Sequence, residues 1–515
     1  MFLFKNLDIM SQADEREAAL LVYARRWEKI MGKRITPLMR ITALLFAAAI
    51  ALTTVGCSGN VAEDENIQPD SDVPSFANQD QDVEQIVNPD RSLFEGETLT
   101  IAESLFAENL KPLAQSYMTE NPGVTIEIID YFDEIVSDGN WLNVQQEIAT
   151  QLMAGSAPVL ISGRLVDHID PRSAVFCADW HPIMAADPEF DEDDWFMNVF
   201  HAASVGGRLY AFPMAFVYET VEANSEIPGL LNAFEDKDGI TITELLTLHR
   251  EIPTDEPYHF DYSTNVNRVV MQHLGSFIDF ETGWADFNND ELMELITYAR
   301  DITDENGSQW RNTGYSLDTQ RILSELYFFM FSTPMNYDFY IDYEEKNPFS
   351  GLLPLVNEQG ELLISPTNEY VLNANATPTQ QALAWDFMRY MMKSDRRDEW
   401  SQLLMQPTNR TRLRVSVEWD AAEHQGWSKD NAFHARRDQL IGTPEEAAES
   451  VIAKMTSFGD MPMRLRSNLP YVLIESDGVI TLALEQFQDG LVSAEQTAQD
   501  LQNRVELVLM EMGLW

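Results

Sequence analysis

The stretch TLTIAESLFAENLKPLAQSYMTENPGVTIEIID, residues 98–130, decides the fold class. Its two ends, residues 98–102 and 124–130, are short runs rich in β-branched and apolar residues, which is typical of strands. Between them, apolar residues recur at the spacing of one helix face. These residues are Leu110, Leu113, Ala114, Tyr117 and Met118. Because Asn121-Pro122-Gly123 breaks helices, we expect the helix to end there.

The same alternation continues further along the chain. A second helical stripe follows and ends near Gly155, before a short apolar strand at residues 157–162. The stripe consists of Trp141, Val144, Ile148 and Leu152. Strands that alternate with helices at this spacing predict a parallel sheet in an α/β fold. Ligands of such folds bind at the carboxyl ends of strands, so Ser162 and Arg164 are candidate ligand contacts.

Length and composition set the outer limits. The chain has 515 residues, and 84 Asp+Glu against 34 Lys+Arg give a formal net charge of −50. This charge excludes the usual nucleic-acid binder, which needs a basic surface for the phosphates. With 45% hydrophobic residues the chain can build large cores, and its length predicts two or three domains.

An export signal is predicted near the N-terminus. The 12-residue apolar run at 41–52 is shorter than a membrane span, which needs about 20 residues. Basic residues precede it and small residues follow it, as in a signal peptide. The following Thr54-Val55-Gly56-Cys57 resembles a bacterial lipobox, with Thr54 where Leu is usual. This resemblance implies that residues 31–56 are a lipoprotein signal peptide and that Cys57 becomes the lipidated N-terminus.

The segments on either side of the signal have distinct compositions. Residues 1–30 carry five carboxylates where a signal peptide is normally basic, which indicates a start at Met31 or a cytoplasmic extension. Residues 57–95 contain ten acidic residues and one basic residue among mostly polar ones. Such a segment buries too little apolar area to fold, so we expect a disordered tether and a folded body from about Gly96.

Two capping boxes predict helix starts in the second half of the chain. Thr377-Pro378-Thr379-Gln380 combines an N-cap threonine, a proline at the first helical position and a glutamine three residues after the cap. Ser493-Ala494-Glu495-Gln496 has the same pattern and opens a C-terminal amphipathic helix. Both are structural signals.

The order of six segments resembles the extracellular solute-binding proteins of bacterial ABC importers, family 1, the sugar-type family that includes maltose-binding protein. Each motif is short, but all six follow the family's order. They are residues 110–128 (LKPLAQSYMTENPGVTIEI), 146–161 (QEIATQLMAGSAPVLI), 207–213 (GRLYAFP), 277–302 (FIDFETGWADFNNDELMELITYARDI), 373–395 (NANATPTQQALAWDFMRYMMKSD) and 493–513 (SAEQTAQDLQNRVELVLMEMG). Val159 departs from the family pattern, which usually has Asp there.

The resemblance implies a two-lobe α/β fold of the periplasmic-binding-protein type, with a hinge and an interlobe ligand cleft. Lobe 1 would comprise residues 96–212 and 366–408. Lobe 2 would comprise residues 213–365 and 409–515. The chain would cross between the lobes near Phe212–Met214, again near Leu363–Asn368, and again after Pro407.

Candidate ligand contacts then follow from position in the expected lobes. Besides Ser162 and Arg164, Phe216 and Tyr218 follow the first crossing. Asn336 and Tyr337 lie in a segment that resembles the family's region bearing a sugar-stacking aromatic. They are preceded by Met335, where the family often has Trp.

The function implied by the resemblance is a lipid-anchored receptor on the extracellular face of the cell membrane. It would be monomeric and deliver a small solute, a sugar or oligosaccharide, to ABC permease subunits. We expect no catalytic residue, cofactor or metal, because the sequence has no Walker loop, no G-x-S-x-G and no H-E-x-x-H. The acidic run 187–194 lacks EF-hand spacing and predicts a solvated turn, and Cys177 predicts a buried bystander. A surface-anchored carbohydrate-active enzyme and a solute sensor for a membrane kinase are the alternatives.

Overall fold

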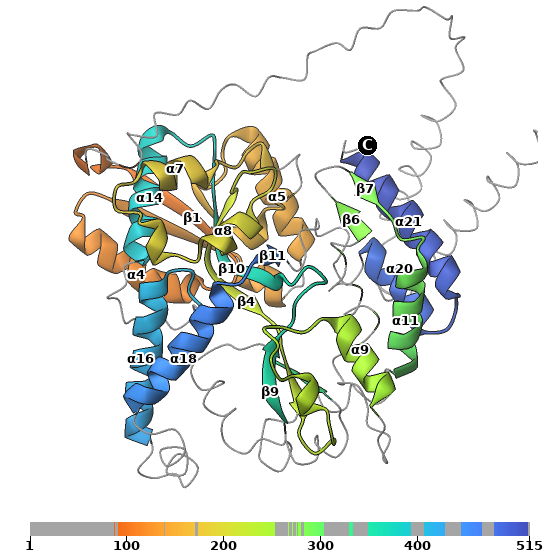
Figure 1. The fold of residues 1–515 in the computed structure, drawn as a ribbon. Helices are drawn as coiled ribbons and strands as arrows, with labels where there is room; N and C mark the ends of the chain where they lie inside the picture. Colours follow the sequence, from red (N-terminus) through yellow and green to blue (C-terminus); the bar gives the residue numbers. More distant parts are fainter. Residues whose placement is uncertain are drawn as a thin grey trace, which may run out of the picture. The chain divides into compact units, whose positions relative to one another are not determined.

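The computed structural model describes most of the chain beyond residue 90 (Figure 1). The described residues are 87, 91–137, 140–169, 174–252, 266, 270, 274, 277–279, 283–302, 329–332, 349–392, 406–427, 444–465 and 478–512. All of them belong to the unit that spans Phe76–Trp515. The signal and Cys57, as well as Asn336 and Tyr337, lie outside the described residues. No helix among the described residues is long and apolar enough to cross a membrane.

The central feature is a six-stranded sheet with the order β11-β10-β3-β1-β2, in which β4 also pairs with β10. β1 is parallel to both β2 and β3, as the alternation of strands and helices predicts. β10 is antiparallel to β3 and to β4, so the sheet is mixed. The strands are β1 (Thr98–Glu103), β2 (Thr125–Asp130), β3 (Leu160–Ser162), β4 (Ala211–Tyr218), β10 (Leu362–Leu372) and β11 (Met463–Leu465).

Alternate strand residues face two different helical layers. Leu99 and Ile101 pack in one core with α4 (Ala107–Glu120) and α14 (Pro378–Met392). Ala102, their neighbour in β1, packs in another core with α5 (Trp141–Ala154). This is the period-two alternation of a strand buried on both faces. Figure 1 shows α4 and α14 on one side of β1 and α5 on the other.

The predicted helix boundaries are confirmed. α4 ends at Glu120, directly before Asn121-Pro122-Gly123. α5 ends at Ala154, and the next residue, Gly155, has a φ of 68°, in the left-handed region that favours glycine. Thr377 Oγ1 accepts from Gln380 N at the start of α14. The capping box at Ser493 opens α21 (Ala494–Glu511).

A second, three-stranded sheet has β5 (Thr220–Asn224) in its centre, between β8 (Phe329–Ser332) and β9 (Phe349–Pro354). Its core is separate from those of the six-stranded sheet and draws on helices far apart in sequence. These helices are α9 (Ile242–Glu251), α11 (Asp290–Ile302), α20 (Val479–Gln488) and α21, and the short pair β6 (Ile278–Asp279) and β7 (Trp284–Ala285) lies beside them.

The chain passes between the two sheets through paired strands. Only Glu219 separates β4 from β5, and residues 355–361 separate β9 from β10. β4 and β10 are themselves antiparallel neighbours, and an isolated bridge between Ala215 and Pro407 places a third segment beside them. The resemblance predicts crossings near 212–214, near 363–368 and after 407. The first two ranges lie within β4 and β10 themselves, so the predicted crossings stay a prediction.

A further core forms where α16 (Arg410–Trp427) and α18 (Pro444–Gly459) pack against β4 and α8 (Met197–Ala203). β11 follows α18 and pairs with β10 in the six-stranded sheet. Part of the predicted lobe 2 segment 409–515 is thus joined to that sheet. The lobe boundaries themselves stay a prediction.

The folded body begins before Gly96. Val87 and Phe94 are buried in the core that contains α4 and α14. Arg91 belongs to the short helix η1 (Arg91–Phe94), and its Nη2 lies 2.8 Å from Asp386 Oδ1 on α14. Two apolar side chains and one ion pair therefore hold the end of the acidic segment, several residues earlier than its composition predicts.

The remaining described elements are short. They are α7 (Trp180–Ala186), η2 (Asp133–Ser137), η3 (Gly163–Leu165), η4 (Glu192–Asp194) and η5 (Leu231–Ala233).

Candidate functional site

Polar side chains gather where β1 and β3 end beside the middle of β10. We call this hollow the sheet-edge pocket. Its interior volume of about 20 Å³ has room for roughly one water molecule, so a larger solute would lie over it rather than within it. It is lined by Glu103, Ser104, Phe106, Ser162, Arg164, Pro366, Thr367, Asn368, Glu369 and Tyr370.

Parallel pairing brings the two serines together. Ala102 of β1 lies opposite Ile161 of β3, so both strands end at the same edge. Ser104 Oγ and Ser162 Oγ are 3.0 Å apart, and both side chains are buried. Arg164 follows on η3, where its carbonyl accepts a hydrogen bond of 3.1 Å from Gln145 Nε2. This bond fixes the backbone at Arg164, while Arg164 itself is exposed to solvent.

Glu103 has a structural part in this pocket. Its carboxylate accepts from Ser104 N at 2.7 Å, from Leu105 N at 3.2 Å and from the Tyr370 hydroxyl at 2.8 Å. Burial, together with the neighbouring Glu103 carboxylate, raises the pKa of Tyr370 well above its ordinary value, so Tyr370 stays a donor. Because all three bonds are internal, Glu103 shapes the turn after β1 rather than presenting a free acceptor.

Asn368 and Glu369 differ from Glu103, because their polar groups are poorly matched within the protein. Asn368 has a φ of 51°, and its Nδ2 is buried without a hydrogen-bond partner among the described residues. Glu369 Oε1 lies 3.8 Å from His168 Nε2. Burial raises the pKa of Glu369, and the charges of His168 and Arg164 oppose this effect.

Gly163 allows β10 to approach this closely. A Cβ at position 163 would lie 2.7 Å from Glu369 Cβ, which is too near for any side chain. The glycine between Ser162 and Arg164 is therefore required by packing. In the sequence, Gly163 stands between the two predicted contacts at the end of a strand, whereas no sequence pattern marked its neighbour Glu369.

The structure brings two of the predicted contacts together and separates two others from them. Ser162 and Arg164 line the sheet-edge pocket. Phe216 and Tyr218 are 1% and 2% exposed and belong to the core formed with α16 and α18. Their rings pack on Phe196 and Phe458, with centroids 5.9 and 5.7 Å apart. Ligand contact by Phe216 and Tyr218 thus stays a prediction that their burial does not support.

Sequence reasoning missed Asn368, Glu369 and His168 as site residues. The one available signal was Pro366-Thr367-Asn368, a turn-like triplet between the apolar ends of β10. His168 belongs to no ligand motif, and its proximity to Glu369 arises from the pairing of β3 with β10. Such tertiary pairings are not visible in local patterns.

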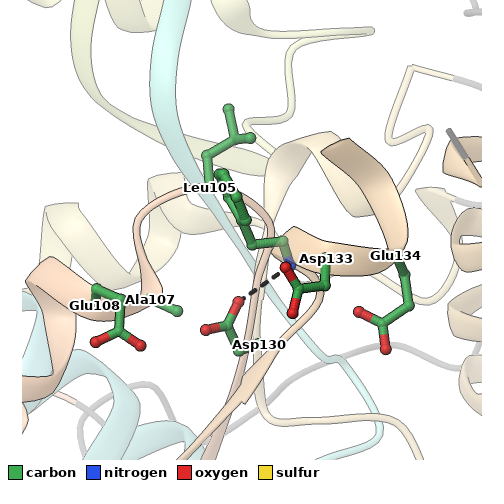
Figure 2. Close-up of a pocket in the computed structure, with 7 residues that line it drawn as sticks. Leu105, Ala107, Glu108, Asp130, Asp133 and Glu134 are labelled. Carbon is green, nitrogen blue, oxygen red and sulfur yellow. Dashed lines mark hydrogen bonds between the residues drawn. The ribbon is translucent and has the colours of Figure 1, made fainter. Parts of the chain in front are cut away.

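A larger acidic hollow lies where β1 and β2 end, as Figure 2 shows. It has a volume of about 420 Å³ and four carboxylates in its lining, from Glu108, Asp130, Asp133 and Glu134. Lys111 pairs with Glu108 and lies 3.5 Å from Asp130 Oδ2. Within the part of the chain that the structure describes, no group of three or more side chains is arranged to hold a metal ion.

The acidic run 187–194 is only partly a solvated turn. Residues 191–194 are exposed as expected, but the prediction is wrong for Asp187, whose side chain is buried. Asp187 Oδ2 accepts from Trp385 Nε1 at 2.8 Å, and Arg389 Nη1 lies 3.4 Å away. An indole donor and a cation thus compensate the buried carboxylate.

Cys177 is buried, as predicted. Burial raises its pKa to about 12. The nucleophilic thiolate is therefore scarce at neutral pH, which removes Cys177 from the reactive groups.

Solved structures resemble this chain over most of its length. The sugar-binding protein MalE from Xanthomonas citri has a TM-score of 0.53 and 13% identity, covering 81% of this chain and 98% of its own. A periplasmic oligogalacturonide-binding protein from Yersinia enterocolitica has a TM-score of 0.51 and 14% identity, covering 81% of this chain and 100% of its own. No protein-family profile and no curated protein sequence matches.

These similarities confirm the fold that the order of the six segments predicts. They are structural, since so few residues are identical. The chain has the two-lobe α/β fold of the periplasmic solute-binding proteins.

Proposed function

We propose that this protein is a lipid-anchored extracellular receptor that binds a sugar or oligosaccharide and delivers it to the permease of an ABC importer. The observation that carries the proposal is the sheet-edge pocket on a periplasmic-binding-protein fold. The pocket occupies the carboxyl ends of β1 and β3, the place where open α/β sheets bind ligands.

The chemistry of the pocket suits a neutral hydroxylated solute. Ser104 and Ser162 offer hydroxyls, Asn368 offers an amide donor and Glu369 offers a carboxylate acceptor. A sugar hydroxyl both donates and accepts, so it can pair with groups of either kind. Two proteins of the same fold bind sugars according to their descriptions, MalE from Xanthomonas citri and the oligogalacturonide-binding protein from Yersinia enterocolitica.

The anchor part of the proposal comes from the sequence. Cys57 follows the predicted signal peptide at 31–56, and a polar acidic segment separates it from the folded body. Because Val87 is already buried in a core, about 30 residues are left to span the distance from membrane to body. Like charges favour an extended conformation of this segment.

One observation favours the enzyme alternative. Glu369 is a carboxyl that is 16% exposed, has a raised pKa and lies beside His168, an arrangement that also occurs in general acid catalysis. Release of free sugar from an oligosaccharide by the purified protein would support this alternative. A receptor would return the solute unchanged.

The direct test is a thermal-shift screen of the purified mature protein with mono- and oligosaccharides, peptides and polyamines. A ligand at 100 times its Kd stabilises the protein by about 2.7 kcal/mol, which gives a clear rise in Tm. We expect a saturable rise with at least one saccharide. No rise with any saccharide, or a rise only with peptides or polyamines, would contradict a sugar receptor.

A further inference from the structure

Asn368 is unusual in both its backbone and its side chain. It lies within β10 and adopts the left-handed conformation, with a φ of 51°. Asp236 is the other non-glycine residue with positive φ among the described residues. Asparagine tolerates this conformation better than most residues, but glycine adopts it without strain. The backbone therefore does not require the amide side chain.

The Asn368 side chain also lowers the stability of the free folded protein. Asn368 Nδ2 is buried and has no hydrogen-bond partner among the described residues. A buried donor that stays unpaired loses its bonds to water without replacement, which destabilises the folded state. Backbone strain and an unpaired donor in one residue are typical of functional positions.

The surroundings of Asn368 show what kind of group could pair with it. It lines the sheet-edge pocket together with Glu369. The Glu103 carboxylate in the same pocket is occupied by three internal donors. The lining holds two carboxyls, of Glu103 and Glu369, against one guanidinium, of Arg164, so a neutral oxygen fits beside Asn368 better than an anionic one.

We propose that Asn368 is a solute-binding residue whose Nδ2 donates to a neutral oxygen of the solute, while Glu369 accepts a bond from a solute hydroxyl. This inference rests on the proposed receptor function and assigns the residues that select a hydroxylated solute. Binding would satisfy the unpaired donor, so the cost of burying it in the free protein is recovered only in the complex.

The test compares three variants of the mature protein with maltotriose and raffinose as probes, using calorimetry for Kd and thermal unfolding for Tm. Asn368→Gly keeps the left-handed backbone and removes the donor. Asn368→Asp keeps the shape and replaces the donor by an acceptor. Asp236→Gly is the matched control, because it changes the other left-handed residue in an exposed turn outside the pocket.

We expect Asn368→Gly to weaken binding of the probe about tenfold, equal to about 1.4 kcal/mol, and to leave the Tm of the free protein unchanged or raised. Asn368→Asp is expected to weaken binding further, since it also adds charge beside Glu369. Asp236→Gly is expected to leave Kd unchanged.

The outcomes separate this inference from the receptor function. If the wild type binds a probe and Asn368→Gly binds it equally well, the inference is overturned and the function stands. A clear fall in the Tm of free Asn368→Gly would make the amide a structural group, which also overturns the inference. If the wild type binds neither probe, both the inference and a receptor for these neutral sugars are overturned.

Discussion

Replacing Glu103 by Ala tests whether this carboxylate orders the candidate site. The substitution removes the acceptor of Ser104 N, Leu105 N and the Tyr370 hydroxyl, all of which are buried or partly buried. A hydrogen bond to a charged group contributes about 1.5–3 kcal/mol, and three such bonds share one carboxylate and are not additive. Water can reach part of the vacated space through the pocket. We therefore expect a loss of about 3–5 kcal/mol in the free energy of unfolding.

The matched variant is Glu103→Gln. Its amide oxygen can still accept from the two backbone N–H groups, while its NH₂ donates to the Tyr370 oxygen. The shape and the number of bonds are kept and only the charge is lost, so the expected cost is about 1 kcal/mol. Urea unfolding of the mature protein, followed by tryptophan fluorescence, measures both variants.

A double-mutant cycle assigns the cost to the bond with Tyr370. Tyr370→Phe removes only the hydroxyl, and the cycle with Glu103→Ala should show a coupling energy of about 1–2 kcal/mol. The reasoning would be refuted by a cost below about 1 kcal/mol for Glu103→Ala, or by equal costs for Ala and Gln. Either result would mean that the three bonds are not formed as described.

Three further predictions concern other parts of the chain. Burial raises the pKa of Glu369, so the contribution of this group to folding stability is present below its unfolded pKa of 4.5 and is lost as pH rises through its folded pKa. Glu369→Gln should therefore have a higher urea midpoint than the wild type at neutral pH. Equal midpoints at all pH values would contradict this. Asp386→Asn should cost about 2 kcal/mol in urea unfolding, because it weakens the bonds from Arg91, Tyr117 and Arg389; a cost near zero would count against the ion-pair network. Cys57→Ala should leave the exported protein unlipidated, and normal membrane retention with a normal mature mass would reject the lipobox.

Local patterns predicted the first layer of the fold well. β1, α4, β2, α5 and β3 occur where hydrophobic periodicity and helix-breaking residues place them. These signals depend on residues within a few positions of each other, so they do not need knowledge of the tertiary structure. The capping boxes at Thr377 and Ser493 were confirmed for the same reason.

Burial of individual side chains could not be predicted in this way. Glu103 follows the apolar residues of β1, where an acidic residue usually marks a solvent-exposed strand end. Instead, the Tyr370 hydroxyl, 267 residues away in sequence, donates to its carboxylate within the sheet. Phe216 and Tyr218 follow a predicted crossing, yet α16 and α18 pack over them from the last quarter of the chain. In both cases the deciding partner is distant in sequence, and one sequence contains no signal for that pairing.

The two kinds of polar group in the sheet-edge pocket have different consequences for binding. Glu103 is fully paired, so it sets the shape of the turn after β1 before any solute arrives. Asn368 Nδ2 has no partner among the described residues and Glu369 is weakly paired, so a solute could supply hydrogen bonds to both. A solute would then supply bonds that the free protein lacks, while Glu103 already fixes the turn. Mutations of the paired group should therefore change stability first, and mutations of the unpaired groups should change affinity first.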